Sequence, residues 1–367
     1  MCTFLTLFFS LINLKPKKMK KIITPLVLFA LSFNTKAQNG IENILFADIS
    51  DANKLTLEYT RPAAEGFIFG MSNGWYHTAK VHKTLGFDIT IGANISSIPS
   101  SREMFDVNAL GLSNKISQNP NTSPTVLASE KADYNAFQVT IPANSNPNIN
   151  GGNHPELTRR FTMPDGLGDD LPLNGIPTPT VQVSVGLPSN FEATVRFIPE
   201  IGDDTSGQLF GLGVKKEITN WFGPVDKTPL HISLMAAYTN MSITSTIDDP
   251  SGNEINITNR VSELDLNSYT VQALASLNLP FVSIYGGLGF IKGSSSLNLR
   301  GNYKLQYQNS INSFSKELND PMNLNYDVSG FTSTIGARFS LGFFKIFGSY
   351  SLQEYNTFSA GIAISIR

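Results

Sequence analysis

Six charged residues occupy polar positions in stretches where apolar and small polar residues alternate. Asp88 lies in "FDITIGANI", Lys215 and Glu217 lie at the end of "FGLGVKKE", and Arg338 lies in "TIGARFSL". Alternate side chains of a strand point to opposite faces, so these charges are expected to share one face with Gly, Ser, Thr and Asn. If the strands close into a barrel, that face is the lumen, where the charges either pair with one another or line a pore. The lumen-facing candidates are Asp88, Glu192, Arg196, Lys215, Glu217 and Arg338.

The sequence carries no other pattern that points to chemistry. His77 and His82 in "YHTAKVH" have no third ligand at a suitable spacing, which favours surface or interface histidines over a metal site. The glycine runs "FGLGVK" and "YGGLGF" do not open a helix, so the phosphate-loop mechanism is missing. No Gly-x-Ser-x-Gly elbow occurs, and the single cysteine is Cys2. We therefore expect no catalytic residues, no metal, no cofactor and no enzyme activity.

The composition limits the possible partners. The 367 residues include 27 basic and 29 acidic side chains, a formal net charge of -2, so no nucleic-acid partner is expected. Charged residues make up 15%, against roughly 25% in ordinary soluble domains. This low share suits a β protein whose exterior is partly apolar.

The first 37 residues are typical of a secretory signal peptide. From Met19 the chain reads "MKKIITPLVLFALSFNTKAQ", a basic start, an apolar run and then small residues before a cleavage point at Ala37. We expect Met19 to be the true start and residues 1–37 to be absent from the exported protein. No cysteine follows, so no lipid anchor is expected. No later apolar run reaches the roughly 20 residues of a membrane helix.

Two periodicities divide the exported chain. Apolar residues spaced by three or four from Ile41 to Tyr59 predict a short amphipathic helix over 38–62, with Pro62 as its stop, inside an N-terminal segment 38–66. From residue 67 to 367 the period is two. It is clearest in "PTPTVQVSVGL", and the strands are about as long as the 9–11 residues that cross a membrane. This predicts a transmembrane antiparallel β-barrel of about 12–14 strands.

The connections between the predicted strands alternate in length. Tight turns such as "LPSN" and "LGFF" alternate with long polar segments at 99–175, 242–264 and 293–328. Outer-membrane barrels have short periplasmic turns and long extracellular loops, so the C-terminus is expected on the periplasmic side. The strands of a soluble β-sandwich also alternate apolar and polar residues. The barrel is favoured because the strands are long, their polar faces carry few charges, and aromatic residues gather near strand ends.

Two segments and the signal peptide carry a resemblance to a known family. "GWYHTAKVHKTLGFDITIGANIS" and "GLGVKKEITNWFGPVDKTPLHISLMAAYT" resemble a family of uncharacterised exported β-barrel proteins of Gram-negative bacteria, known as a domain of unknown function. That likeness covers most of residues 40–367. The layout is also similar to the FadL/TodX long-chain fatty-acid transporter superfamily, in which a helical segment precedes a barrel. This second resemblance implies passive uptake of hydrophobic molecules, with residues 38–62 as a plug in the lumen.

Together these observations predict an outer-membrane barrel that serves as a channel or transporter for small molecules, hydrophobic ones included. The alternative is a non-transporting barrel that acts as a surface or assembly platform through its long loops. Expected partners are outer-membrane lipid, the barrel-assembly machinery during insertion and a small hydrophobic ligand. A lumen packed with side chains would favour the platform, whereas a continuous cavity would favour the transporter.

Overall fold

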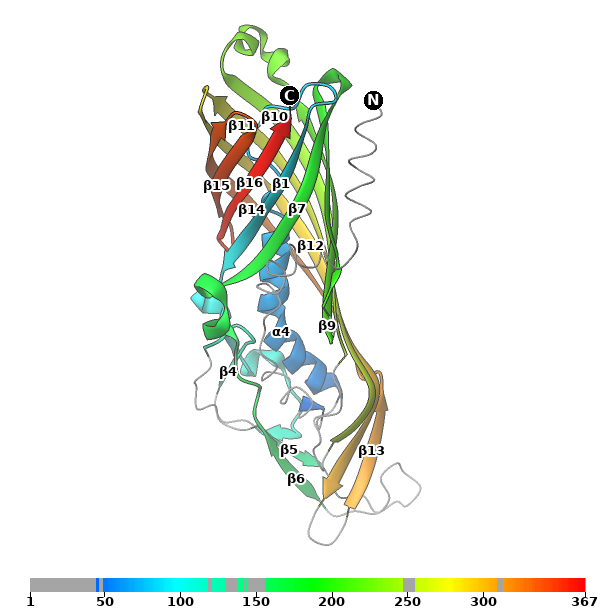
Figure 1. Ribbon diagram of the computed structural model, residues 1–367. Helices are drawn as coiled ribbons and strands as arrows, with labels where there is room; N and C mark the ends of the chain where they lie inside the picture. The colour runs from blue at the N-terminus through cyan, green and yellow to red at the C-terminus, as the bar shows by residue number, and fades with distance from the viewer. Residues whose placement is uncertain are drawn as a thin grey trace.

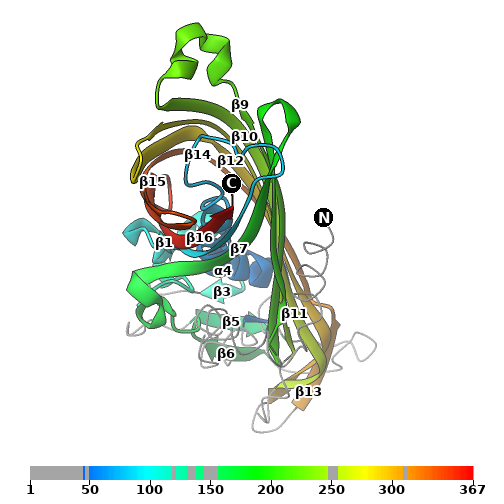
Figure 2. The same cartoon turned by 45° about the horizontal axis from the view of Figure 1, so that its top comes forward.

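Ten antiparallel strands close into a ring (Figures 1 and 2). The computed structural model describes residues 44–45, 49–117, 121–129, 137–141, 143, 156–202, 204–246, 255–308 and 313–366, and the predicted signal peptide lies outside them. Strands pair in the order β11-β10-β9-β8-β7-β1-β16-β15-β14-β12, and β12 pairs back with β11. This closure confirms the antiparallel barrel, because an open sandwich would leave unpaired edges.

The ring is built from strands of very different length. Their bounds are β1 (Phe87–Ser97), β7 (Gly175–Leu187), β8 (Phe191–Ile201), β9 (Thr205–Glu217), β10 (Leu230–Thr246), β11 (Ile255–Asn278), β12 (Val282–Gln308), β14 (Met322–Leu341), β15 (Phe344–Leu352) and β16 (Thr357–Ile366). The connections β7–β8, β11–β12 and β14–β15 are short and lie, with the C-terminus, at the upper end in Figure 1. We call this the short-turn end, and the opposite one the long-loop end.

The prediction of 12–14 strands was too high. The segment 99–175, predicted as a long polar connection, contributes only short strands in two small separate sheets, and β13 pairs only with β12 beyond the ring. These pieces are β2 (Met104–Asp106), β3 (Ile116–Ser117), β4 (Thr122–Pro124), β5 (Phe137–Ile141), β6 (Leu157–Phe161) and β13 (Ser313–Asn319). Single turns of 3-10 helix connect several elements: η2 (Ser100–Arg102), η3 (Asn108–Leu110), η4 (Gly168–Asp170), η5 (Pro172–Asn174) and η6 (Pro188–Asn190), with the longer η7 (Thr219–Lys227).

The outward face of the ring changes character along each long strand. On β14, Phe331, Ile335 and Phe339 point outward toward the short-turn end and are 80%, 65% and 54% exposed. Toward the long-loop end the outward positions of the same strand are polar, as at Asn323 and Asn325. The inward face changes in the opposite sense, from small polar residues to buried apolar ones. The ring therefore has an apolar belt on its outside at one end and an apolar core on its inside at the other.

Strand β12 shows the same inversion. Its outward residues run from Leu288 and Phe290, both exposed, to the exposed Lys292 and Arg300. This explains why the predicted loops at 242–264 and 293–328 were wrong over most of their described length: β10, β11, β12 and β14 continue through them. The alternation persists there, but the apolar residues face inward and the outer surface is polar, so the segments look loop-like in composition.

The inversion predicts a boundary between lipid and water near residue 330 of β14. A fluorophore attached to cysteine at Ile335→Cys should be quenched by nitroxide-labelled lipid in vesicles, and one at Asn325→Cys should be quenched only by a water-soluble quencher. Both positions are outward on one strand, and the only native cysteine, Cys2, lies in the predicted signal peptide. Equal quenching of the two sites by lipid would contradict the boundary.

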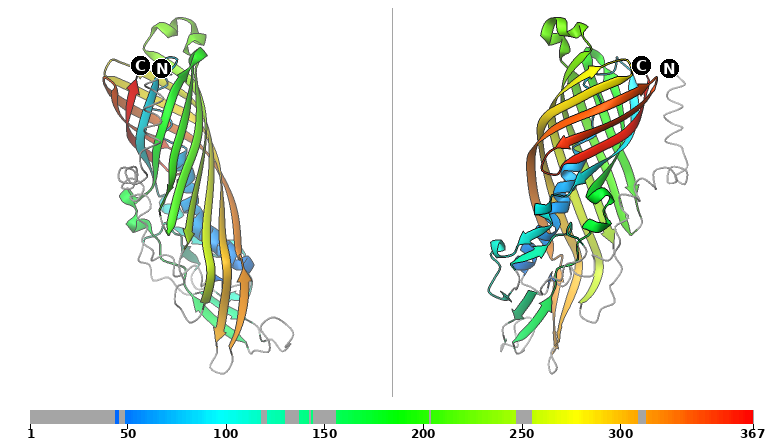
Figure 3. Two further views of the ribbon diagram at one scale, coloured as in Figure 1. Left: turned by 45° about the vertical axis from the view of Figure 1, so that its right-hand side comes forward. Right: turned by 90° about the vertical axis from the view of Figure 1, so that its left-hand side faces the viewer.

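The helix predicted over 38–62 is present from Ile49 but continues past Pro62 to Met71, and residues 38–43 and 46–48 lie outside the described residues. Helix α4 (Ile49–Met71) runs from the long-loop end into the ring (Figure 3). Leu55 and Tyr59 are buried, as the apolar spacing predicted. Pro62 lies inside the helix and does not end it, because packing on all sides within the barrel offsets the one hydrogen bond that proline removes. Among the described residues, no helix is long and apolar enough to cross a membrane.

A hydrophobic core fills the long-loop end. Leu55 and Tyr59 of α4 pack with Tyr303 and Leu305 of β12 and with Phe105 of the segment between β1 and β7. We call this part the long-loop module: the start of α4, the far ends of β11, β12 and β14, β13, and the described residues of 99–175. Its apolar interior and polar exterior are those of a water-soluble domain.

Candidate functional site

A segment without regular structure runs through the lumen. Residues 72–86, which we call the lumen segment, connect the end of α4 to β1. At one end the Ser72 hydroxyl bonds that of Ser268, and at the other the Leu85 amide donates to the Gly186 carbonyl near the short-turn end. Ala79 is fully buried between these ends. The prediction that the barrel begins at residue 67 was therefore wrong, since twenty residues of helix and lumen segment precede β1.

Two of the six predicted charges accept backbone amides of the lumen segment. Glu192 Oε2 accepts from the His82 amide at 3.0 Å, and Glu217 Oε2 accepts from the Val81 amide at 3.0 Å. Each carboxylate also holds an imidazole: Nδ1 of His82 lies 2.8 Å from Glu192, and Nδ1 of His231 lies 2.6 Å from Glu217. The carboxylates thus supply the acceptors that the extended segment would otherwise lack inside the barrel.

Two further charges, both cations, donate to carbonyls of the same part of the chain. Lys215 Nζ reaches the Thr78 and Lys80 carbonyls at 3.3 and 3.4 Å, and pairs with Glu192 Oε1 at 2.7 Å. Arg196 is completely buried and donates to the carbonyls of Met71 and Asn73 at 2.8 and 3.0 Å. The four side chains together bind donors and acceptors along the lumen segment.

The indole of Trp75 packs between Arg196 and strand β9. The Arg196 guanidinium carbon lies 3.9 Å from the centroid of its ring, within the range of a cation–π contact. On the other side the ring lies against β9 at Gly211 and Gly213, where an added Cβ would come within 2.9 and 3.1 Å of indole atoms. These glycines leave the space that the indole occupies.

The remaining two charges meet at His77. Arg338 Nη1 lies 3.1 Å from His77 Nδ1, and because arginine can only donate, Nδ1 accepts. The other ring nitrogen, Nε2, then donates to Asp88 Oδ2 at 3.1 Å. Both histidines of "YHTAKVH" therefore lie inside the barrel, at the contact between the lumen segment and the wall, so of the predicted surface or interface positions the surface one was wrong. All six predicted charges face the lumen and bind the lumen segment or its side chains.

A buried carboxylate anchors α4 where the helix enters the ring. Glu65 is fully buried and accepts from the hydroxyls of Tyr355, at 2.8 Å, and Tyr326, while Arg61 and Arg102 lie 3.0 and 3.5 Å away. Burial, and next the charge of Glu65, raise the pKa of Tyr355 far above its ordinary value. That tyrosine therefore stays protonated and keeps donating. The sequence prediction did not include Glu65, because a single glutamate in an amphipathic helix looks like a solvent-facing residue.

Within the described part of the chain, no group of three or more His, Cys, Asp and Glu side chains could hold a metal ion. The polar side chains of the lumen bind the backbone amides and carbonyls of the lumen segment. Sequence reasoning missed this partner, although residues 72–86 have neither helical nor strand periodicity, which was the available signal.

The fold and the filled lumen define the class of protein, a closed antiparallel β-barrel that encloses part of its own chain. The chain belongs to the Family of unknown function (DUF6588), whose pattern matches residues 19–366. This confirms the predicted membership of a family of unknown function.

Similar solved structures are barrels with low identity. They include Ail, the attachment invasion locus protein of Yersinia pestis (9% identity, covering 77% of this chain and 99% of that one, TM-score 0.25). Another is the translocator domain of the autotransporter NalP from Neisseria meningitidis (10% identity, 78% of this chain and 90% of that one, TM-score 0.28). A third is a BenF-like porin from Pseudomonas fluorescens Pf-5 (9% identity, 77% of this chain and 98% of that one, TM-score 0.13). Superpositions this loose say nothing about what the chain does. A search of curated proteins found no match.

Proposed function

We propose that this protein is a closed outer-membrane barrel that anchors the long-loop module at the cell surface as a platform. The lumen segment carries the proposal, because it fills the ring and is held there by charged and polar side chains from β1, β7, β8, β9, β10, β11 and β14. A lumen occupied in this way favours a closed barrel over an open channel. The proposal gives the chain no catalytic role.

Three observations support the outer membrane as its location. The N-terminal residues are typical of an export signal. The outward face of the ring carries an apolar belt, and Trp221, Phe281 and Phe343 are exposed at the short-turn end, where an interfacial girdle would place aromatic residues. The short turns lie at the end that holds the C-terminus, which puts the long-loop module outside the cell. Outer-membrane lipid and the barrel-assembly machinery are then its partners during insertion.

Uptake of small hydrophobic molecules, which the FadL-like layout implied, requires the lumen segment to move. The FadL-like layout stays a prediction. Many contacts of the lumen segment are polar, and polar contacts can be exchanged for water when a plug leaves. Transport is therefore the function to be tested against the platform.

A lockable variant separates the two functions. The Thr78 and Ser276 hydroxyls lie 3.1 Å apart, so a Thr78→Cys/Ser276→Cys pair should tie the lumen segment to β11 when oxidised. In planar bilayers we expect no conductance from the parent protein or from the pair, oxidised or reduced. Deletion of residues 38–86 should open an ion-conducting ring. Conductance or fatty-acid uptake by the parent and by the reduced pair, lost when the pair is oxidised, would overturn the platform in favour of a gated transporter.

A further inference from the structure

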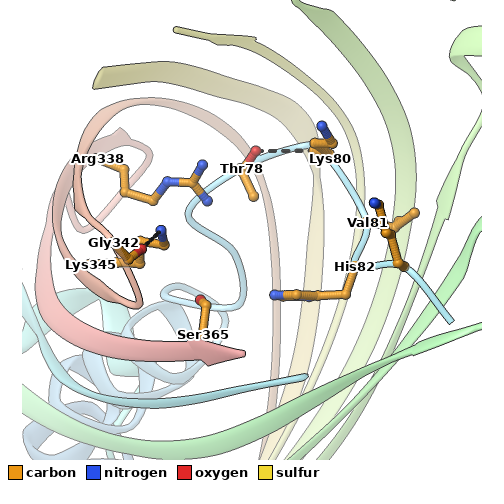
Figure 4. A pocket seen from close by; sticks show the side chains of 9 residues that line it. Thr78, Lys80, Val81, His82, Arg338, Gly342, Lys345 and Ser365 are labelled. Carbon is orange, nitrogen blue, oxygen red and sulfur yellow. Dashed lines mark hydrogen bonds between the residues drawn. The ribbon is translucent and has the colours of Figure 1, made fainter. Parts of the chain in front are cut away.

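An open pocket of about 370 Å³ lies at the short-turn end of the lumen (Figure 4). Its lining comes from two parts of the chain that are remote in sequence. One side belongs to the lumen segment and the other to the wall, at the end of β14, the following turn, β15 and the end of β16. The lining residues are Thr78, Lys80, Val81, His82, Lys83, Arg338, Gly342, Lys345 and Ser365.

Four cations and no carboxylate line this pocket. Lys80 and Lys83 come from the lumen segment and are exposed, whereas Arg338 and Lys345 come from the wall. The nearest lumen carboxylates, Asp88 and Glu192, are engaged by His77, His82 and Lys215. Among the described residues, none of the four cations has a carboxylate oxygen within 4.0 Å, the limit for an ion pair.

The donors of the wall cations are only partly used. Lys345 Nζ donates to the Gly342 carbonyl at 2.6 Å, which leaves two of its three hydrogens. Arg338 donates one hydrogen to His77 through Nη1 and one to Ser283 through Nη2, at 3.1 and 3.0 Å, and each nitrogen carries a second hydrogen. Like charges gathered in one pocket repel each other, so an anion placed between them gains from all four.

We propose that this pocket binds a phosphate group, which bridges the lumen segment to the barrel wall and holds the segment in place. Lysine serves phosphate as a point charge and arginine as a fork, and both kinds of donor are present on the wall side. The space is larger than a bare ion needs, so the ligand is a phosphorylated molecule. Two sources share this chemistry: a phospholipid headgroup from the adjoining leaflet and a soluble phosphate ester. The site goes beyond the platform role and exists whether or not the barrel conducts.

The test uses the full exported chain folded in a neutral detergent without phosphate. The urea midpoint of unfolding is followed by gel mobility of the unboiled protein while three probes are titrated: inorganic phosphate, glycerol 3-phosphate and short-chain phosphatidylglycerol. Sodium chloride at matched ionic strength controls for screening of the cations. We expect the phosphate probes to raise the urea midpoint above the value measured in sodium chloride at the same ionic strength.

Two variants locate the site from its two sides. Lys80→Gln/Lys83→Gln and Lys345→Gln should each weaken the apparent affinity at least about tenfold, the loss expected for a hydrogen bond to a charged group. Because they relieve repulsion, both should be as stable as the parent without phosphate, which separates lost binding from misfolding. Lys292→Gln, at an exposed lysine on the outward face of β12, should leave the affinity unchanged.

The outcomes decide both the site and its ligand. Stabilisation by all three probes identifies a soluble phosphate ester as sufficient, whereas stabilisation by phosphatidylglycerol alone identifies a lipid headgroup. An equal rise with chloride, or equal affinities in the parent and both variants, would overturn the proposal. None of these results depends on conductance, so they leave the platform proposal to its own test.

Discussion

Replacing Arg196 by methionine is expected to lower the free energy of unfolding of the lumen segment by about 2–4 kcal/mol. Methionine keeps much of the length but leaves the Met71 and Asn73 carbonyls without their donors. Each buried acceptor left unpaired costs about 1–3 kcal/mol, and the contact with the Trp75 ring is lost as well. Against this, methionine avoids the cost of burying a cation, so the loss is smaller than the sum of the lost contacts.

The chain offers a direct reporter for this prediction. It has two tryptophans, Trp75 in the lumen and Trp221, which is 66% exposed at the short-turn end. In a Trp221→Phe background, Trp75 emission should shift to the red at lower urea in Arg196→Met than in the parent. Arg300→Met is the matched control, because Arg300 is mostly exposed and pairs with the partly exposed Glu263, a pair worth at most about 1 kcal/mol. Coincident Trp75 transitions in the parent and Arg196→Met would show that the contacts of Arg196 do not stabilise the lumen segment.

The sequence was most informative for strands whose outward face is part of the apolar belt. The bounds of β1 and β7 fall within two residues of the stretches predicted from "FDITIGANI" and "PTPTVQVSVGL". Lipid imposes a strict alternation on such strands, because every outward position must be apolar. The same rule placed Arg338 on the inner face.

Prediction from the sequence failed where the environment reverses or the partner is remote. Leu297, Leu299 and Tyr303 alternate along β12 as regularly as any belt residues, but they face inward against α4, so the polar outer face dominated the composition. The contacts that hold the lumen segment join residues that are far apart along the chain: Glu192 and Glu217 bind amides 110 and 136 residues away. A single sequence shows that these carboxylates face inward, and it contains nothing that says which backbone groups they meet.

Moving a cation from the inner to the outer face of β14 is the second expected large effect. Its size should depend on depth. The outward residues of the belt on this strand run from Phe331 to Leu341. Ten steps of about 3.3 Å, tilted by about 40°, span about 25 Å, the height of the apolar band of an outer-membrane barrel. Ile335 then lies near the middle of the belt, whereas Phe339 lies nearer its short-turn edge.

Ile335→Arg should therefore reduce the stability of the folded barrel in vesicles by about 2–4 kcal/mol, and Phe339→Arg by less. The exchange Arg338→Ser/Phe339→Arg should cost more than Phe339→Arg alone, because it also removes the hydrogen bond to His77. Asn325→Arg is the control: the position is outward on the same strand but beyond the belt, so it should be nearly neutral. Urea unfolding followed by gel mobility of unboiled samples gives all four values. A cost at Asn325 equal to that at Ile335 would show that the outer face is not in lipid, because water would then bathe both positions alike.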